Sequence, residues 1–212
     1  MSFSAELRAA AGPIWEAQHE HPFVRGIGEG SVDTERFQHW VRQDYRFLGE
    51  YCRLFALAAA RAPDLPTLRR FAELLQATAV TEMDLHRSFA AQLGISAEEL
   101  EAEEMAPVTR AYTDFLLRTA AIGDFAELAA ALLPCMWGFS EIGLRLADRG
   151  RPADPRCAAW IDAYADPEFG RLAEWCRDLV DGLAEEAGPP ARARMREAFI
   201  VSSRYELAFW DV

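Results

Sequence analysis

The spacing of apolar residues constrains the fold of this chain more than any other feature of its sequence. Apolar side chains recur every three or four residues through long segments, which is the pattern of an α-helix with one buried face. No segment alternates apolar and polar residues as a half-buried strand does, and no internal repeat is visible. Long helices joined by short loops predict an all-α helical bundle.

Turn and capping residues set the boundaries of these helices. We predict helices over about residues 2–18, 33–62, 66–92 and 124–148, a helix after Pro107, two shorter helices after residue 154, and a last helix that follows residues 188–190 and runs to the end of the chain. The acidic stretch 96–104 predicts a short exposed helix and a linker. The first segment is expected to break at His21 and Pro22, with a glycine-punctuated turn over residues 26–30.

Length and composition indicate one ordinary globular domain. The chain has 212 residues, of which 51% are hydrophobic and 26% charged. A chain of this length buries roughly 70% of the surface that its unfolded form exposes, which is enough to enclose a small molecule. We therefore expect a single domain over residues 1–212.

The charge of the chain bears on its partners and location. A formal net charge of −12 repels phosphate groups, so we expect no nucleic-acid partner and no membrane partner. The N-terminal segment lacks the basic and apolar regions of a signal peptide, and no stretch approaches the roughly 20 apolar residues that span a bilayer. We expect a cytoplasmic protein whose four cysteines stay reduced, and their spacing contains no CxxC pair that would indicate a zinc site.

Polar residues interrupt the buried stripes of four predicted helices. The stripes are Trp40, Asp44, Phe47 and Tyr51; Val108, Tyr112 and Phe115; Leu128, Leu132, Cys135, Phe139, Ile142 and Leu146; and Phe199, Ser203, Glu206 and Trp210. Cys135 taken alone suits a small core residue, and Tyr112 a core tyrosine. Asp44 and Glu206 have no Lys or Arg near them on their own stripes, so they belong either to a structural network or to a site.

The residues around Cys135 suggest how a thiol is presented inside a helix. Pro134 removes a hydrogen bond within its helix and predicts a kink, and Gly138 leaves room one turn further on. A kink beside a thiol suits a nucleophile, whereas the alternative is that Pro134 only shapes helix packing.

Several short motifs, which occur in order along the whole chain, resemble those of the TenA (thiaminase II) family. They are HPFVRGIGEG at 21–30, QD at 43–44, AYT at 111–113, LLPCMW at 132–137, EIG at 141–143, WIDAY at 160–164, SSRYE at 202–206 and FW at 209–210. The resemblance implies a haem-oxygenase-like helical fold that binds no haem, usually assembled as a homotetramer.

The resemblance also implies a reaction and the residues that perform it. Cys135 would add to an electron-poor carbon of an aminopyrimidine ring, and Glu206 would act as the acid and base that releases the substituent on the exocyclic methylene and activates water. Asp44 would bind the nitrogen edge of the ring and help to activate the thiol, while Tyr112 and Tyr164 would orient these groups. No metal and no organic cofactor would be needed. The substrate would be aminomethyl-aminopyrimidine or thiamine, in a salvage reaction that yields hydroxymethylpyrimidine.

Two substrate-facing positions depart from the family pattern. Phe47 and Phe139 stand where the family often has tyrosine, so two hydroxyl groups are missing although both rings can stack on a pyrimidine. Met136 replaces an aromatic residue, and the chain ends two residues after Trp210.

Two other functions compete with this reading. A carboxylate-bridged di-metal oxidase would use Glu82 and His86, spaced i, i+4, with Asp44 and Glu206; the chain has one ExxH motif, which ends at His19. We expect His86 to be a core or hydrogen-bonding histidine. A non-catalytic pyrimidine-binding or regulatory protein is the third possibility.

Overall fold

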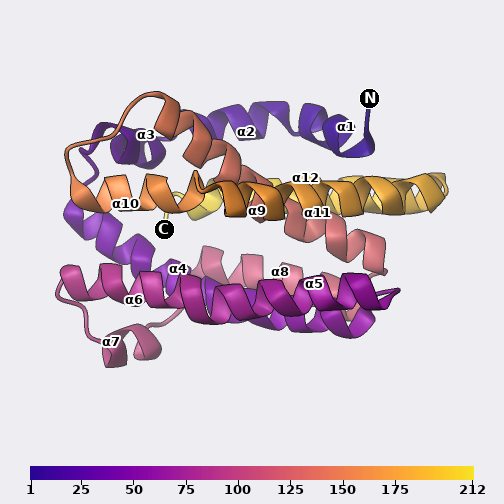
Figure 1. Ribbon diagram of the computed structural model, residues 1–212, viewed down its shortest axis with the longest axis horizontal. Helices are drawn as coiled ribbons and strands as arrows, with labels where there is room; N and C mark the ends of the chain where they lie inside the picture. Colours follow the sequence, from indigo (N-terminus) through magenta and orange to yellow (C-terminus); the bar gives the residue numbers. More distant parts are fainter. The chain divides into compact units, whose positions relative to one another are not determined.

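The computed structural model describes residues 1–212, which form helices and no strand, so the all-α prediction is confirmed (Figure 1). The chain divides into two compact units. The first unit contains residues 1–33 and 126–211, and the second contains residues 34–125 together with residue 212. Each unit is described by itself.

The second unit is built around one long helix. Its elements are α4 (Thr34–Arg61), α5 (Leu65–Gln76), η1 (Ala77–Glu82), α6 (Met83–Gln92), α7 (Ala97–Ala102) and α8 (Pro107–Ile122). The α4 helix packs against α5, α6 and α8 (Figure 1). Its inward stripe is buried. Ser96 and Glu99 form a capping box at the start of α7, which accounts for the short helix predicted in the acidic stretch.

The predicted helix 66–92 contains a π-helical segment, η1, that the sequence pattern did not indicate. A π-helix takes an extra residue per turn, so it rotates the face of every residue that follows. The residues that follow η1 include His86, whose side chain is buried on the inward face of α6.

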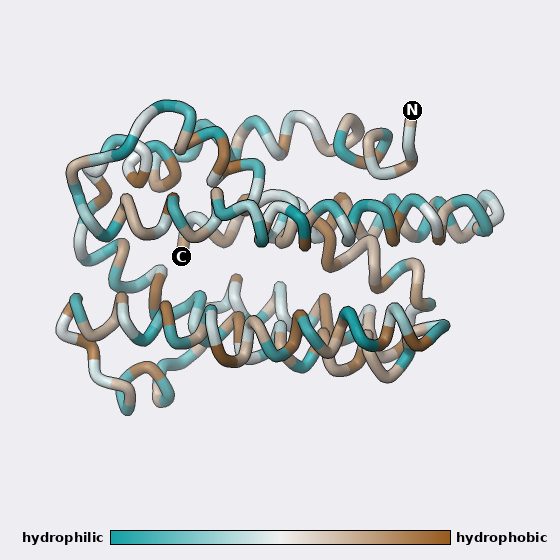
Figure 2. The backbone as a smooth tube through the Cα atoms, in the orientation of Figure 1, coloured by the Kyte–Doolittle hydropathy of each residue, from teal (hydrophilic) through white to brown (hydrophobic).

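The first unit consists of seven helices. They are α1 (Phe3–Ala10), α2 (Gly12–His19), α3 (Pro22–Glu29), α9 (Phe125–Asp148, almost wholly in this unit), α10 (Pro155–Tyr164), α11 (Pro167–Glu186) and α12 (Pro189–Phe209). Packed pairs are α1 with α11, α2 with α12, and α3 with α10. Figure 2 shows both hydrophobic and hydrophilic residues along each long helix, as expected for a helix with one buried and one exposed side.

Two boundaries near the N-terminus differ from the prediction. The first segment is split at Ala11 into α1 and α2, because Pro13 cannot continue a helix from the preceding turn. Residues 22–29, predicted as a break, form α3. Pro22 occupies the first turn, the His21 side chain caps it, and Gly30 ends it with a left-handed φ of 69° that favours glycine.

The central helix of the first unit is α9, which runs through Pro134 without ending. By length and composition α9 could cross a membrane, and 72% of its most apolar window is buried inside the structure. A buried core helix meets the same criterion, so this helix is weak evidence for a membrane span, although it qualifies the expectation that no stretch is apolar enough.

Candidate functional site

Three predicted site residues lie in the second unit. Asp44 and Phe47 are one turn apart on α4, and the Phe47 ring contacts Tyr112 of α8 with the ring centroids 5.1 Å apart. All three side chains are buried. The contact between α4 and α8 therefore brings Phe47 and Tyr112 together, and Asp44 precedes them by one turn.

Asp44 has a charged partner that sequence reasoning missed. The Nε2 atom of His86 on α6 lies 2.5 Å from Oδ2 of Asp44, and the exposed fractions of the two residues are 1% and 3%. His86 Nδ1 lies 3.0 Å from the backbone oxygen of Glu82. The expectation that His86 is a hydrogen-bonding core histidine is confirmed. The di-metal alternative grouped His86 with Asp44 as metal ligands, but no feature of the sequence indicated that the two side chains pair directly.

The electrostatics of this pair favour a protonated imidazole. Burial by itself lowers the pKa of His86, but the neighbouring Asp44 carboxylate, and then Glu82, raise it, and the net direction is upward from 6.5. A buried carboxylate is costly without such a partner. The ion pair explains how Asp44 can sit on an aromatic stripe that has no Lys or Arg.

The other four predicted site residues lie in the first unit, beginning with the thiol. Cys135 is half-buried on α9, directly after Pro134. A Cβ atom built on Gly138 would have no atom within 4 Å, apart from its chain neighbours and the nearby backbone of its own helix. The space predicted one turn beyond the thiol is therefore present.

Glu206 is 3% exposed on α12, and helix α2 fixes the residues on either side of it. Trp15 Nε1 donates a hydrogen bond to Oγ of Ser203, 3.0 Å away, and Trp210 Nε1 donates one to Oε1 of Gln18, 3.1 Å away. Ser203 precedes Glu206 by three residues and Trp210 follows it by four, so all three share one helix face.

Aromatic contacts join the helices of Cys135, Glu206 and Tyr164. The Phe139 ring lies 5.2 Å from Trp210 and 4.9 Å from Tyr164, centroid to centroid. Phe139 is one turn after Cys135 on α9, and Trp210, the C-cap of α12, follows Glu206 by four residues. A Cβ on Gly143 would lie 2.5 Å from the carbonyl carbon of Tyr164, so only glycine allows α9 this close to the end of α10.

The structure thus groups the predicted residues into two sets, Cys135, Phe139, Tyr164 and Glu206 in the first unit and Asp44, Phe47 and Tyr112 in the second. That both sets line one cavity stays a prediction.

Two of the remaining cysteines differ from the reactive type. All four cysteines are thiols rather than disulfides. Burial raises the pKa of Cys52 to about 11, with a contribution from Glu82, and burial likewise raises that of Cys157 to about 11, with a contribution from Asp154. Thiols of this kind are poor nucleophiles at neutral pH because the thiolate is the reactive form.

The arrangement of acidic and histidine side chains does not resemble a di-metal centre. No three His, Cys, Asp or Glu side chains gather where they could hold a metal ion. Both ring nitrogens of His86 are engaged, one by Asp44 and the other by the Glu82 carbonyl. The ExxH histidine, His19, pairs with Glu141 at 3.3 Å and also contacts Arg145.

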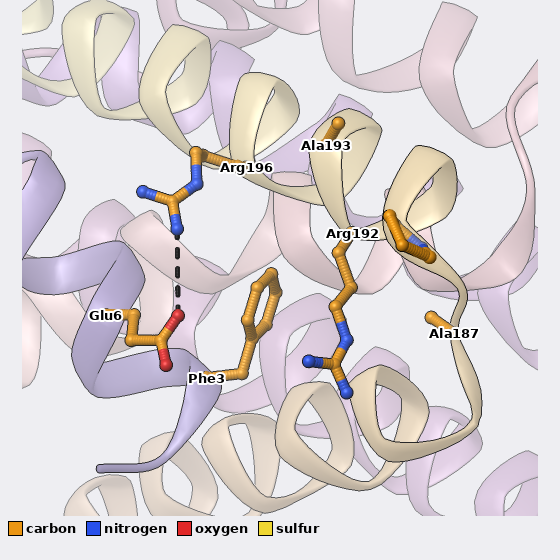
Figure 3. Close-up of a pocket in the computed structure, with 7 residues that line it drawn as sticks. Phe3, Glu6, Ala187, Arg192, Ala193 and Arg196 are labelled. Carbon is orange, nitrogen blue, oxygen red and sulfur yellow. Dashed lines mark ion pairs between the residues drawn. The ribbon is translucent and has the colours of Figure 1, made fainter.

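A surface pocket of about 410 Å³ in the first unit contains none of the predicted site residues. Its lining residues are Phe3, Glu6, Ala187, Pro189, Arg192, Ala193 and Arg196 (Figure 3). Its arginines are already engaged: Arg196 pairs with Glu6 at 3.7 Å, and Arg192 donates to the Ala184 carbonyl.

Known proteins match this chain over its whole length. An aminopyrimidine aminohydrolase of Halalkalibacterium halodurans is 46% identical over 213 residues, covering 100% of this chain and 95% of the relative. The solved structure of a TenA homologue from P. horikoshii OT3 has a TM-score of 0.92 at 30% identity, covering 100% of this chain and 97% of that one.

The fold is also that of a more distant protein. A domain of unknown function from Shewanella denitrificans with a heme oxygenase-like fold has a TM-score of 0.75 at 14% identity, covering 98% of this chain and 90% of that one. This likeness concerns the fold alone and confirms the expected haem-oxygenase-like architecture. The model of the TENA/THI-4/PQQC family matches residues 8–212. The chain belongs to the TENA/THI-4/PQQC family.

Proposed function

We propose that this protein is an aminopyrimidine aminohydrolase of the thiaminase II type. The observation that carries the proposal is the near-half identity, over the full length, to a relative of that name. The reaction replaces the amino group of an aminomethyl-aminopyrimidine by a hydroxyl group, consuming one water and releasing one ammonia. The product, hydroxymethylpyrimidine, would re-enter thiamine synthesis as a salvaged precursor.

Cys135 is the proposed nucleophile. Its sulfur adds to an electron-poor ring carbon, and the loss of aromaticity allows the bond between the exocyclic methylene and its nitrogen to break. Water then bonds to the methylene carbon, and departure of the sulfur restores the aromatic ring. Its place beside Pro134, with open space at Gly138, supports this role.

Glu206 is the proposed acid and base. As the acid it protonates the departing amine, and as the base it takes a proton from the attacking water. Its burial and its bracing by the Trp15 and Gln18 hydrogen bonds suit a carboxyl group that must keep one position through both steps.

Asp44 is proposed to bind the nitrogen edge of the ring, where the amino group can donate to its carboxylate, and to assist the thiol. Tyr112 and Tyr164 orient these groups, and the rings of Phe47 and Phe139 offer flat surfaces against which a pyrimidine can stack. We further propose a cytoplasmic location. We also propose a homotetramer, and sedimentation of the purified protein would check this oligomeric state.

Steady-state kinetics with aminomethyl-aminopyrimidine and with thiamine, measured side by side, test the proposal. We expect a higher kcat/KM for aminomethyl-aminopyrimidine. Cys135→Ser should lower kcat by about a thousandfold or more, and Glu206→Gln by roughly 10²–10⁴-fold. Cys52→Ser, which changes another half-buried thiol, is the matched control and should keep wild-type rates.

A wild-type protein that binds hydroxymethylpyrimidine but turns over neither compound would contradict the proposal and favour a binding or regulatory role. Full activity in Cys135→Ser would contradict the proposed nucleophile.

A further inference from the structure

We propose that His86 is a positioning residue of the active site, which holds Asp44 in the orientation needed to bind the pyrimidine edge. The inference rests on the proposed function, because it assigns His86 a role through Asp44. It is carried by the buried contact between α4 and α6.

The hydrogen-bond pattern of the imidazole fixes where its protons lie. The partner of Nδ1 is a backbone carbonyl, 3.0 Å away at Glu82, and a carbonyl can only accept, so Nδ1 carries a proton. Nε2 and Oδ2 of Asp44 form an ion pair with the two atoms 2.5 Å apart, and no other group hydrogen-bonds to either of these buried atoms. A proton must therefore lie between them, because two bare acceptors would repel at this distance.

The surroundings of His86 keep this proton in place. The imidazole ring lies 5.9 Å from Trp40 and 6.1 Å from Phe89, centroid to centroid, so aromatic rings flank it from both α4 and α6. The side chain is almost fully buried, and water therefore does not compete for Asp44 Oδ2. In such surroundings a hydrogen bond between charged groups is strong and its geometry is well defined.

The helix that carries His86 is adapted to this contact. The π-helical segment η1 ends at Glu82, and the carbonyl of Glu82 accepts the proton from His86 Nδ1. Single π-helical turns occur often at functional sites, where they re-aim the side chains that follow. In this chain the segment lies one turn before the histidine that reaches Asp44.

The contact has a consequence for the carboxylate. His86 engages Oδ2, which leaves Oδ1 to accept a hydrogen bond from a substrate amino group. A positive imidazolium also offsets the free-energy cost of burying the negative carboxylate. A carboxylate anion is the form that accepts a hydrogen bond from the amino group of an aminopyrimidine. Without His86, Asp44 would lose its buried partner and be free to rotate.

The test is a double-mutant cycle between His86 and Asp44, with kcat and KM measured for aminomethyl-aminopyrimidine and product affinity measured by calorimetry. His86→Leu should lower kcat/KM and product affinity about 10- to 100-fold, as loss of an outer partner does at other sites. In the Asp44→Asn background the same change should have less than a twofold further effect, because the two residues act as one unit.

His86→Gln keeps an N–H donor at the Nε2 position and should recover most of the loss. His39→Gln, an exposed histidine of α4, is the matched control.

An NMR titration of ¹⁵N-labelled imidazole reports the pair without catalysis, and it covers the case in which His86→Leu does not fold. The wild type should show both His86 nitrogens protonated to higher pH than in Asp44→Asn. Equal titration in the two proteins, multiplicative effects in the cycle, or His86→Gln as impaired as His86→Leu would each overturn the positioning role. Absence of turnover in the wild type would instead contradict the proposed function, and the titration and product affinity would still decide on His86.

Discussion

Trp15 on α2 donates the hydrogen of its indole Nε1 to Oγ of Ser203 on α12 across 3.0 Å, and both residues are buried. The Trp15 ring also stacks on Phe199, one turn before Ser203, at a centroid distance of 5.9 Å. Together with the Gln18 contact of Trp210, these interactions hold α12 on both sides of Glu206. The position of the proposed acid is therefore set by α2 rather than by α12 alone.

Ser203→Ala should lower both stability and activity. The change leaves the buried indole N–H without its acceptor, which costs about 1–3 kcal/mol in the free energy of unfolding. If α2 positions Glu206, kcat should fall more than KM rises. Urea unfolding and steady-state kinetics measure the two effects. Ser88→Ala, at an exposed helix position, should change stability by less than about 0.5 kcal/mol. Equal stability in both variants would show that the hydrogen bond contributes nothing.

Gly143→Ala should displace Tyr164. The added methyl group would lie 2.5–2.8 Å from backbone atoms of Tyr164 and Ala165, so α10 must move, at a cost of about 1–3 kcal/mol. We expect a lower melting temperature and a raised KM. Gly182→Ala is the matched control, because its methyl group meets nothing within 4 Å in an exposed part of α11. That variant should gain up to about 1 kcal/mol from helix propensity. Opposite signs in the two variants are thus expected, and a stabilised Gly143→Ala would refute the close packing.

Iodoacetamide should distinguish Cys135 from the other thiols. At pH 8, three units below a pKa of about 11, about one in a thousand Cys52 or Cys157 side chains is ionised. We therefore expect alkylation of Cys135 to be faster and to run in parallel with the loss of activity. Peptide mapping by mass spectrometry identifies the labelled residue. Loss of activity that runs in parallel with Cys52 labelling would point to another thiol. So would loss of the residual activity of Cys135→Ser on treatment with iodoacetamide.

The parts of this structure that follow from local pattern could be predicted from the sequence. The stripes that contain Cys135 and Glu206 lie on single helices, and a 3.6-residue period identifies such faces without tertiary information. The short helix after Ser96 follows from its capping box in the same way. These elements therefore agree with the prediction within a few residues.

The parts that depend on contacts between helices could not be predicted. The glycines of residues 26–30 suggested a turn, but Gly26 packs against the Val32 backbone, where a Cβ would lie 3.2 Å from its Cα, and the helix is retained. The partner of Asp44 is 42 positions away, at His86, beyond the reach of any periodicity argument. The π-helix before His86 has no composition signature, because its sequence, ATAVTE, would also suit an α-helix.

The pH dependence of stability offers a last test of the buried pair. The Asp44 carboxylate, aided by Glu82, raises the pKa of His86 above its ordinary value of 6.5 in the folded protein, despite burial. A group with a raised folded-state pKa stabilises the fold fully below its unfolded pKa, near 6.5, and this contribution is lost as the pH rises through the folded-state value. We expect the free energy of unfolding that the pair contributes to decline from about pH 6.5 upward, by at most about 1.4 kcal/mol per pH unit.

Asp44→Asn should reverse this trend. With the carboxylate gone, burial dominates and lowers the pKa of His86, so the variant should lose stability as the pH falls. His19 in the first unit, whose pKa burial and Arg145 lower, titrates in both proteins, so the difference between wild type and variant isolates the pair. Urea unfolding at a series of pH values from 5.5 to about 9 measures that difference, with His39→Gln expected to follow the wild type. The two proteins could instead differ in free energy of unfolding by the same amount at every pH. That result would contradict the raised pKa of His86 in the folded protein.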